Sequence, residues 1–396
     1  MKKALGKQDK NRVLFVVVLF WSALYLHMPY QTVFLLNAGV SADVVGVVVG
    51  AYGLSQVFLR IPLGLLADIG GRHKVFLVGG PLFIALAAVS RTLLTNSTGF
   101  LIANICSGIS AATWISYMVY FAGFYPANKM TTSNGRIISA NNFGVFIAYI
   151  IGLLVYSRWG MSFLCIIAFA IALGATLLIS TEKEPRKPAR RPSMAVIKEL
   201  FGSCMNANLV LFSLIALLVQ GLIFATSNSF SGQILNMLGA KSWQLGVFSV
   251  ISTSAMMTTA YLSSLEPIIR QGRRKFILAA FVVLGIGCLL LPNTEFIWQV
   301  YLIGMMSGFA NGFAYSYVTS EAIAQTPVFS RSTAVGFFQA VYALGMCLMP
   351  IAVGYLVKRY DIATAYYACA GLCLLAVLTI LTVIVKERQW SAVGSH

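Results

Sequence analysis

Ten polar side chains lie well inside long apolar stretches of this chain, and hydrogen bonding is the chemistry that they could do. Amide groups donate and accept hydrogen bonds, and an imidazole can also carry a proton. Because a polar side chain that faces lipid is costly, we expect these groups to face a protein interior or a water-filled path. The ten residues are His27, Gln31, Gln56, Asn104, Asn141, Asn142, Gln220, Asn228, Asn311 and Gln339.

The spacing of these groups favours a shared cavity, and simple packing between helices is the alternative for each of them. Residues three or four apart lie on one helix face. Pairs with this spacing are His27 and Gln31, Asn311 and Tyr315, and Trp114 and Tyr117. His27 is the candidate proton site because no Asp or Glu lies near the centre of an apolar stretch; the other interpretation is a hydrogen-bonding residue of the cavity.

Patterns typical of enzymes are missing from the sequence. It has no nucleotide-binding loop and no paired acids at helical spacing, and its three histidines are scattered. We therefore expect no enzyme, with no catalytic residue, cofactor or metal. The net charge of +17 does not indicate a nucleic-acid partner, because the basic residues lie at the ends of the apolar stretches.

The elements that must position the polar groups are membrane-spanning helices. Apolar residues make up 59% of the 396 residues and charged residues 10%, with a mean hydropathy of +0.83. Soluble proteins carry about 25% charged residues. At about 20 apolar residues per crossing, the chain predicts an all-α polytopic membrane protein with about twelve helices. The predicted ranges are 13–35, 44–66, 75–95, 99–122, 137–157, 161–180, 207–230, 243–265, 275–292, 296–321, 332–357 and 363–385.

These helices fall into two groups of six. The stretch from Glu182 to Ser193 is rich in Pro and charge and cannot enter a bilayer. We therefore predict an N-terminal bundle over 1–181, a linker over 182–206 with a surface segment near 194–205, and a C-terminal bundle over 207–396. Gly108 and Gly308 lie in similar pentapeptides 200 positions apart, which indicates an internal repeat. Helices 3, 6, 9 and 12 hold none of the ten polar groups, so we expect them outside.

The basic residues predict the orientation. With the N-terminus inside, 22 of the 28 Lys and Arg residues fall on the cytoplasmic side, and Arg60 lies within the second helix. This asymmetry predicts a multi-pass protein with both termini in the cytoplasm. The five on the opposite side are Arg91, Arg158, Lys241, Lys358 and Arg359.

One loop could act as a latch between two conformations. After the second helix the chain reads Arg60-Ile-Pro-Leu-Gly64-Leu-Leu-Ala-Asp68-Ile-Gly70-Gly71-Arg72-His73-Lys74. Gly64 permits close helix contact, and Arg72 and Lys74 hold the turn at Gly71 on the cytoplasmic side. The Asp68 carboxylate at the boundary needs a partner or a helix N-terminus. Arg60 is either part of this latch, a residue that snorkels to the interface, or an anion contact.

This segment closely resembles the signature loop of the major facilitator superfamily, Gly-x-x-x-Asp-x-x-Gly-Arg-x-Lys or Arg. The resemblance implies two six-helix bundles that rock about a substrate by alternating access. It also implies that helices 1, 4, 7 and 10 line the cavity, and that the Asp68 loop stabilises the outward-facing state. In the second half, residues 266–275 keep Gly-Arg-Arg without a clean acidic match, and Asn104 stands where many exporters of the family carry an arginine.

The sequence thus predicts two sets of functional residues. The latch set is Arg60, Gly64, Asp68, Gly71, Arg72 and Lys74. The substrate-cavity set is His27, Tyr30, Gln31, Asn104, Trp114, Tyr117, Asn142, Gln220, Asn228, Asn311, Tyr315 and Gln339.

The predicted function is a permease in the cytoplasmic membrane that moves a small organic solute, either by secondary active or by facilitative transport. A mostly neutral, aromatic cavity suits a small polar or amphipathic solute. The alternatives are a proton-coupled exporter of drugs or metabolites in the same family, and a non-transporting sensor on the same scaffold. The expected partners are the solute, the lipid bilayer and a coupling proton, and we expect a monomer.

Overall fold

The computed structural model describes residues 7–69, 73–125, 130–182, 193–263, 265 and 272–393, and the described residues are almost entirely helical, without strands. The N-terminal part begins with two helices that together make the first crossing, with the chain bending at His27. In chain order its helices are α1 (Lys7–Tyr25), α2 (Met28–Asn37), α3 (Ala42–Ile69), α4 (Lys74–Leu93), α5 (Ser97–Ala112), α6 (Trp114–Ala122) and α7 (Met130–Ser180).

The C-terminal part follows α8 (Met194–Cys204), a helix in the predicted linker that Ser193 caps by accepting a hydrogen bond from the Val196 amide. The rest comprises α9 (Ala207–Ala225), a π-helical turn (Thr226–Phe230), α10 (Ser231–Met237), α11 (Ser242–Leu262), α13 (Arg273–Leu290), a 3-10 turn (Leu291–Asn293), α14 (Ile297–Ile323), a 3-10 turn (Val328–Ser330), α15 (Arg331–Arg359) and α16 (Ile362–Val393).

These helices make twelve crossings, as predicted. Among the described residues, ten helical stretches are long and apolar enough to cross a membrane. The 51-residue α7 is two of the predicted helices joined without a loop, because Gly160 turns the chain with φ 72° and ψ −169°. The 27-residue α14 provides the remaining crossing. The fold is thus an all-α bundle of two six-helix halves, and the domain boundaries at 181 and 206 remain predictions.

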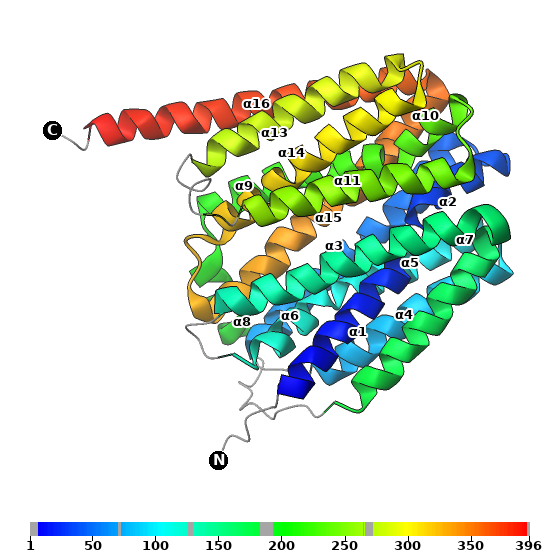
Figure 1. Cartoon of the computed structure of the whole chain (residues 1–396). Coiled ribbons are helices and arrows are strands. Elements are labelled where there is room, and N and C mark those ends of the chain that lie inside the picture. The colour runs from blue at the N-terminus through cyan, green and yellow to red at the C-terminus, as the bar shows by residue number, and fades with distance from the viewer. Residues whose placement is uncertain are drawn as a thin grey trace.

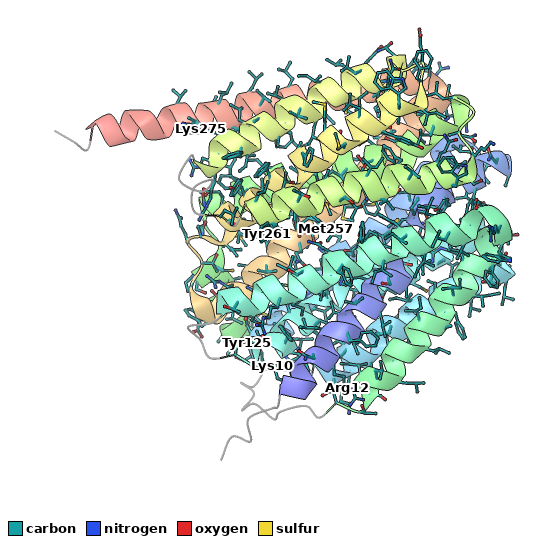
Figure 2. All side chains as sticks on the ribbon, in the orientation of Figure 1. Lys10, Arg12, Tyr125, Met257, Tyr261 and Lys275 are labelled. Atoms are coloured by element: carbon teal, nitrogen blue, oxygen red, sulfur yellow. The ribbon has the colours of Figure 1, made fainter. Side chains whose placement is uncertain are left out.

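The two ends of the helices can be told apart in the structure. The start of α1 and the end of α16 both lie away from the bend of α7, which is on the right of Figure 1. We call these the inner and the outer end. Lys10 and Arg12 lie near the start of α1, and Lys275 lies near the start of α13 (Figure 2). This arrangement agrees with an even number of crossings.

The most extensive contact between the halves is made by α3 and α15, which lie antiparallel. A Cβ atom on Gly53 would lie 2.6 Å from the Ala343 carbonyl oxygen, and one on Gly64 would lie 2.6 Å from the Ser332 carbonyl oxygen. On the other helix, a Cβ atom on Gly336 would lie 2.7 Å from the Arg60 carbonyl oxygen. Backbone therefore meets backbone along this contact, which only glycine permits.

We predict that Gly53→Ala destabilises the protein by about 1–3 kcal/mol, because a methyl group there must push the two helix backbones apart. Gly79→Ala is the matched control, since no atom lies within 4 Å of a Cβ at that position of α4. It should be neutral or stabilising, because alanine is the better helix former. The measurement is the melting temperature of each purified variant in detergent; equal values for the two variants would contradict the contact.

Candidate functional site

A cavity of about 200 Å³ lies between the two halves. Its wall comes from α1, α3, α6 and the first part of α7 on one side, and from α9, the π-helical turn, α11, α14 and α15 on the other. Among the described residues, α4, the second part of α7, α13 and α16 contribute nothing to the wall. These four are the predicted helices 3, 6, 9 and 12, which agrees with their expected position outside.

Aromatic rings form much of the cavity wall. The Trp21 and Trp114 rings meet edge to face with 5.3 Å between centroids. Tyr52 of α3 and Phe224 of α9 stack at 5.2 Å, so this pair joins the two halves. Such ring pairs stabilise by about 0.5–1.5 kcal/mol beyond their buried area. The aromatic residues of the wall are Trp21, Tyr25, Tyr52, Trp114, Tyr149, Phe224, Tyr315 and Tyr342.

Amide and hydroxyl groups complete the wall, and some of them have unused hydrogen-bonding capacity. Gln56 donates to the Tyr52 carbonyl oxygen at 2.9 Å. Its Oε1 atom and the Oδ1 atom of Asn311 accept no hydrogen bond from the described part of the chain. Ser227 and Asn228 reach the wall from the π-helical turn, and such turns are frequent at functional sites. The wall therefore offers amide and hydroxyl groups to a polar solute, and the two buried oxygens keep unused accepting capacity beside it.

Arg60 is the one charged residue of the cavity wall among the described residues. Its side chain is 3% exposed. The guanidinium carbon lies 4.7 Å from the centre of the Tyr342 ring, and Nη1 donates to the Gln339 carbonyl oxygen at 3.4 Å. Arg60 was predicted in the latch set, with an anion contact as one alternative, and its side chain lines the cavity, two helical turns from Asp68.

Six of the twelve predicted cavity residues line this cavity and six do not. Those in the wall are Trp114, Asn142, Gln220, Asn228, Asn311 and Tyr315. Those outside it are His27, Tyr30, Gln31, Asn104, Tyr117 and Gln339. The wall residues that the prediction left out include Tyr25, Tyr52, Asn141 and Tyr342.

His27, Gln31 and Asn104 belong to a polar cluster inside the N-terminal half. Asn104 donates to Gln31 Oε1 at 3.3 Å and accepts from Arg91 at 2.7 Å. Arg91 also donates to Ser107 at 3.1 Å. Arg91, one of the five basic residues predicted on the side opposite the cytoplasm, is only 3% exposed, because the last turn of α4 faces the half's own core. His27 lies beside Asn104 and Arg91.

The other three residues outside the wall serve local contacts. Tyr30 stacks on Tyr156 with 4.0 Å between ring centroids. The Tyr117 hydroxyl donates to the Leu77 carbonyl oxygen at 2.6 Å. Gln339 is buried behind Arg60, where its backbone oxygen accepts the arginine's hydrogen bond. The Tyr117 hydroxyl is thus satisfied inside its own half, whereas the Tyr30 hydroxyl and Gln339 Oε1 are buried without a hydrogen-bond partner in the described part of the chain.

At the inner end, Asp68 binds the N-terminus of α15, and we call this contact the Asp68 latch. The carboxylate accepts hydrogen bonds from the Ser332 amide at 3.3 Å, the Thr333 amide at 2.6 Å and the Thr333 hydroxyl at 2.7 Å. Burial raises the pKa of Asp68, and the hydrogen bonds from Thr333 and Ser332 oppose that rise. A carboxylate at a helix N-terminus is favoured by the helix dipole. Gly71 and Arg72 lie outside the described residues, and Lys74 begins α4.

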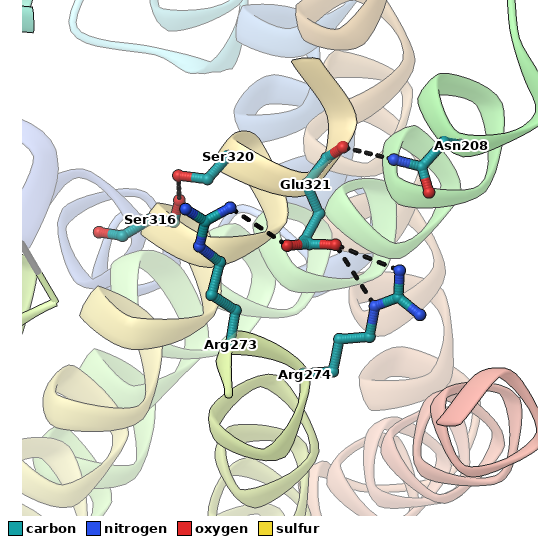
Figure 3. A network of polar contacts seen from close by, with 6 residues as sticks. All are labelled: Asn208, Arg273, Arg274, Ser316, Ser320 and Glu321. Carbon is teal, nitrogen blue, oxygen red and sulfur yellow. Dashed lines mark hydrogen bonds and ion pairs between the residues drawn. The ribbon is translucent and has the colours of Figure 1, made fainter. Parts of the chain in front are cut away.

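In the second half, the basic residues at the corresponding position pair with a carboxylate of their own half. Figure 3 shows Glu321 at the end of α14 between Arg273 and Arg274 at the start of α13. Arg273 Nη1 lies 3.4 Å from Oε1, and Arg274 Nη2 lies 3.3 Å from Oε2 of this carboxylate. Asn208 donates to the Glu321 carbonyl oxygen at 2.6 Å. The acid missing from residues 266–275 is therefore supplied within the same half by the tenth crossing.

At the outer end, the halves touch through small polar groups. The hydroxyls of Thr32 and Ser229 lie 2.8 Å apart, and Asn236 donates to Asn37 Oδ1 at 3.1 Å. Lys358 of α15 pairs with Asp43 of α3 at 2.8 Å. The Asp68 latch is thus made at the same time as the outer contacts, and the cavity lies between the two.

Comparison with known proteins shows which family and which solved structures this chain resembles. The family model described as Major Facilitator Superfamily matches residues 13–269 and 238–393. The chain is 21% identical over 374 residues to an uncharacterized MFS-type transporter of Methanocaldococcus jannaschii, covering 91% of this chain and 95% of the relative.

Two solved structures share the fold. The nucleoside transporter NupG has a TM-score of 0.74 at 15% identity, over 95% of this chain and 98% of that one. The human organic anion transporter MFSD10 has a TM-score of 0.71 at 16% identity, over 95% of this chain and 100% of that one.

We predict that Glu321→Gln destabilises the C-terminal half by about 1–3 kcal/mol, because two partly buried guanidinium groups lose their shared anion. Glu295→Gln is the control, since that side chain is exposed near the start of α14. Thermal unfolding of the two purified variants is the measurement. The ion-pair network would be unimportant if both variants unfolded at the wild-type temperature.

Proposed function

Because the chain belongs to the major facilitator superfamily, we propose that it moves a small organic solute across a cell membrane by alternating access, as a secondary active or facilitative transporter. The observation that carries this proposal is a cavity walled by both halves and bounded by separate contacts at the inner and outer ends. Separate contacts of this kind can be made and broken in turn while the halves stay folded.

The size and chemistry of the cavity favour a small polar or amphipathic solute. Pockets for drug-sized ligands measure roughly 300–1,000 Å³, and this cavity measures about 200 Å³. A proton-coupled exporter is the alternative within the family. The described cavity wall contains no Asp, Glu or His, so the solute site itself offers no proton acceptor of that kind.

We further propose a monomer that spans the membrane with both chain ends in the cytoplasm. The excess of basic residues on that side supports the orientation. Large apolar side chains on the outer helices support contact with lipid: Leu177 is 69% exposed and Leu374 is 59% exposed.

The proposal is tested by screening the purified protein against a solute library by thermal shift, then measuring counterflow of each stabilising solute in proteoliposomes. Ligand stabilisation follows mass action, so even weak substrates register at high concentration. We expect stabilising solutes to exchange across the membrane. Stabilisation without any flux would instead indicate a sensor on the same scaffold.

We predict that Asp68→Asn leaves the protein folded and slows flux. Loss of the charge weakens a charged hydrogen bond by about 1.5–3 kcal/mol, which shifts the balance of inward- and outward-facing states by about tenfold or more. Asp361→Asn is the matched control, because Asp361 accepts from the Thr364 amide within its own half. Proteoliposome flux should fall only for Asp68→Asn; unchanged flux in both variants would exclude the latch.

We predict that His27→Gln keeps any pH dependence of flux. The imidazole lies beside Arg91 and Asn104 inside one half, away from the cavity wall. The measurement is solute uptake driven by an imposed pH gradient, with counterflow at equal pH as the control. Loss of pH-driven uptake with normal counterflow would make His27 the proton site.

A further inference from the structure

We propose that the transported solute is a small organic monoanion, and that Arg60 binds its carboxylate. This inference rests on the proposed function, because it names the class of solute for the same cavity. It depends on three features of the described residues: the charge balance of the wall, the way in which Arg60 is held, and the groups that face it.

The charge balance of the cavity wall favours an anion. Arg60 is 3% exposed, and no carboxylate of the described chain lies within ion-pair distance of it. Its Nε atom has no hydrogen-bond partner there, and its hydrogen bond to the Gln339 carbonyl oxygen is long, at 3.4 Å. A buried cation without a counterion is costly. A bound carboxylate would offset this cost and occupy the unused donors.

The surroundings hold the guanidinium in place before a solute arrives. The Arg60 backbone is fixed by its contact with Gly336, where a Cβ atom would come within 2.7 Å of the Arg60 oxygen. The guanidinium lies over the Tyr342 ring, and Tyr342 in turn meets Tyr315 edge to face at 6.1 Å. A planar guanidinium held on an aromatic face can bind a carboxylate through two parallel hydrogen bonds.

The rest of the wall fits an uncharged, partly aromatic body. The pairs Trp21–Trp114 and Tyr52–Phe224 offer apolar ring surfaces. The free acceptors Gln56 Oε1 and Asn311 Oδ1 suit a hydroxyl or N–H donor on the solute. A carboxylate, a ring or short apolar chain and one donor group together match this set within about 200 Å³.

The experiment compares two probes that differ only in the charged group, 4-hydroxybenzoate and 4-hydroxybenzamide. Binding to the purified protein is followed by tryptophan fluorescence, because Trp21 and Trp114 form part of the wall. We expect the carboxylate to bind at least about tenfold more tightly than the amide, as a charge-assisted bidentate contact requires.

Variants locate the source of this preference. Arg60→Gln should abolish the preference for the carboxylate and leave binding of the amide unchanged. Arg60→Lys should keep part of it, because lysine retains the charge without the planar fork. Arg158→Gln, at an exposed arginine away from the cavity, should behave like wild type. A purely structural role of Arg60 would change the binding of both probes alike, so the ratio of the two affinities separates the roles.

Three results would overturn the inference: equal binding of the two probes to the wild type, no binding of either up to about 10 mM, or a preference that survives Arg60→Gln. If Arg60→Gln does not fold, an unreduced preference in Arg60→Lys would count against it as well. Counterflow separates this failure from that of the proposed function. If only neutral solutes exchange, the proposed transport function stands and the anionic solute is excluded. If Arg60-dependent binding occurs without exchange of any solute, the anion site stands and the transport function is excluded.

Discussion

The structure depends on the close approach of α3 and α15, two helices from different halves whose backbones touch. Glycines on both helices make this contact possible, and a side chain on either surface would separate the halves. Arg60 and Asp68 lie four residues to either side of Gly64, so all three share one face of α3. The same contact therefore brings one cation to Tyr342 at the cavity and one carboxylate to the N-terminus of α15.

Most of the fold could be predicted from the sequence, because the thickness of a bilayer fixes the length of an apolar helix. Twelve apolar stretches predicted the crossings, and the polar-free helices predicted which four lie outside. Breaks within crossings could not be predicted. Pro29 after the bend at His27, the polar residues 226–229 of the π-helical turn and Arg158 before Gly160 do interrupt the apolar runs. A polar residue or a proline inside such a run does not tell which backbone geometry will follow.

The site was only half predictable for a related physical reason. Helical spacing tells which residues share a face of a helix. It does not tell whether that face packs against helices of the same half or points toward the other half. Asn104 and Gln31 face inward within the first half, where Arg91 is buried with them. One part of the cavity wall could have been predicted. Tyr52, Gln56 and Arg60 recur every four positions and therefore share one face of the second crossing.

The π-helical turn from Thr226 to Phe230 inserts one extra residue per turn into the seventh crossing. One residue corresponds to about 100° of rotation along an α-helix, so α10 presents a different side of its sequence than a regular helix would. This rotation brings Ser229 to Thr32 while Ser227 and Asn228 stay at the cavity. In a homologue that lacks one residue here, the segment that corresponds to α10 would be rotated about the helix axis. It would then make different contacts with the other half at the outer end, while the cavity wall would stay the same.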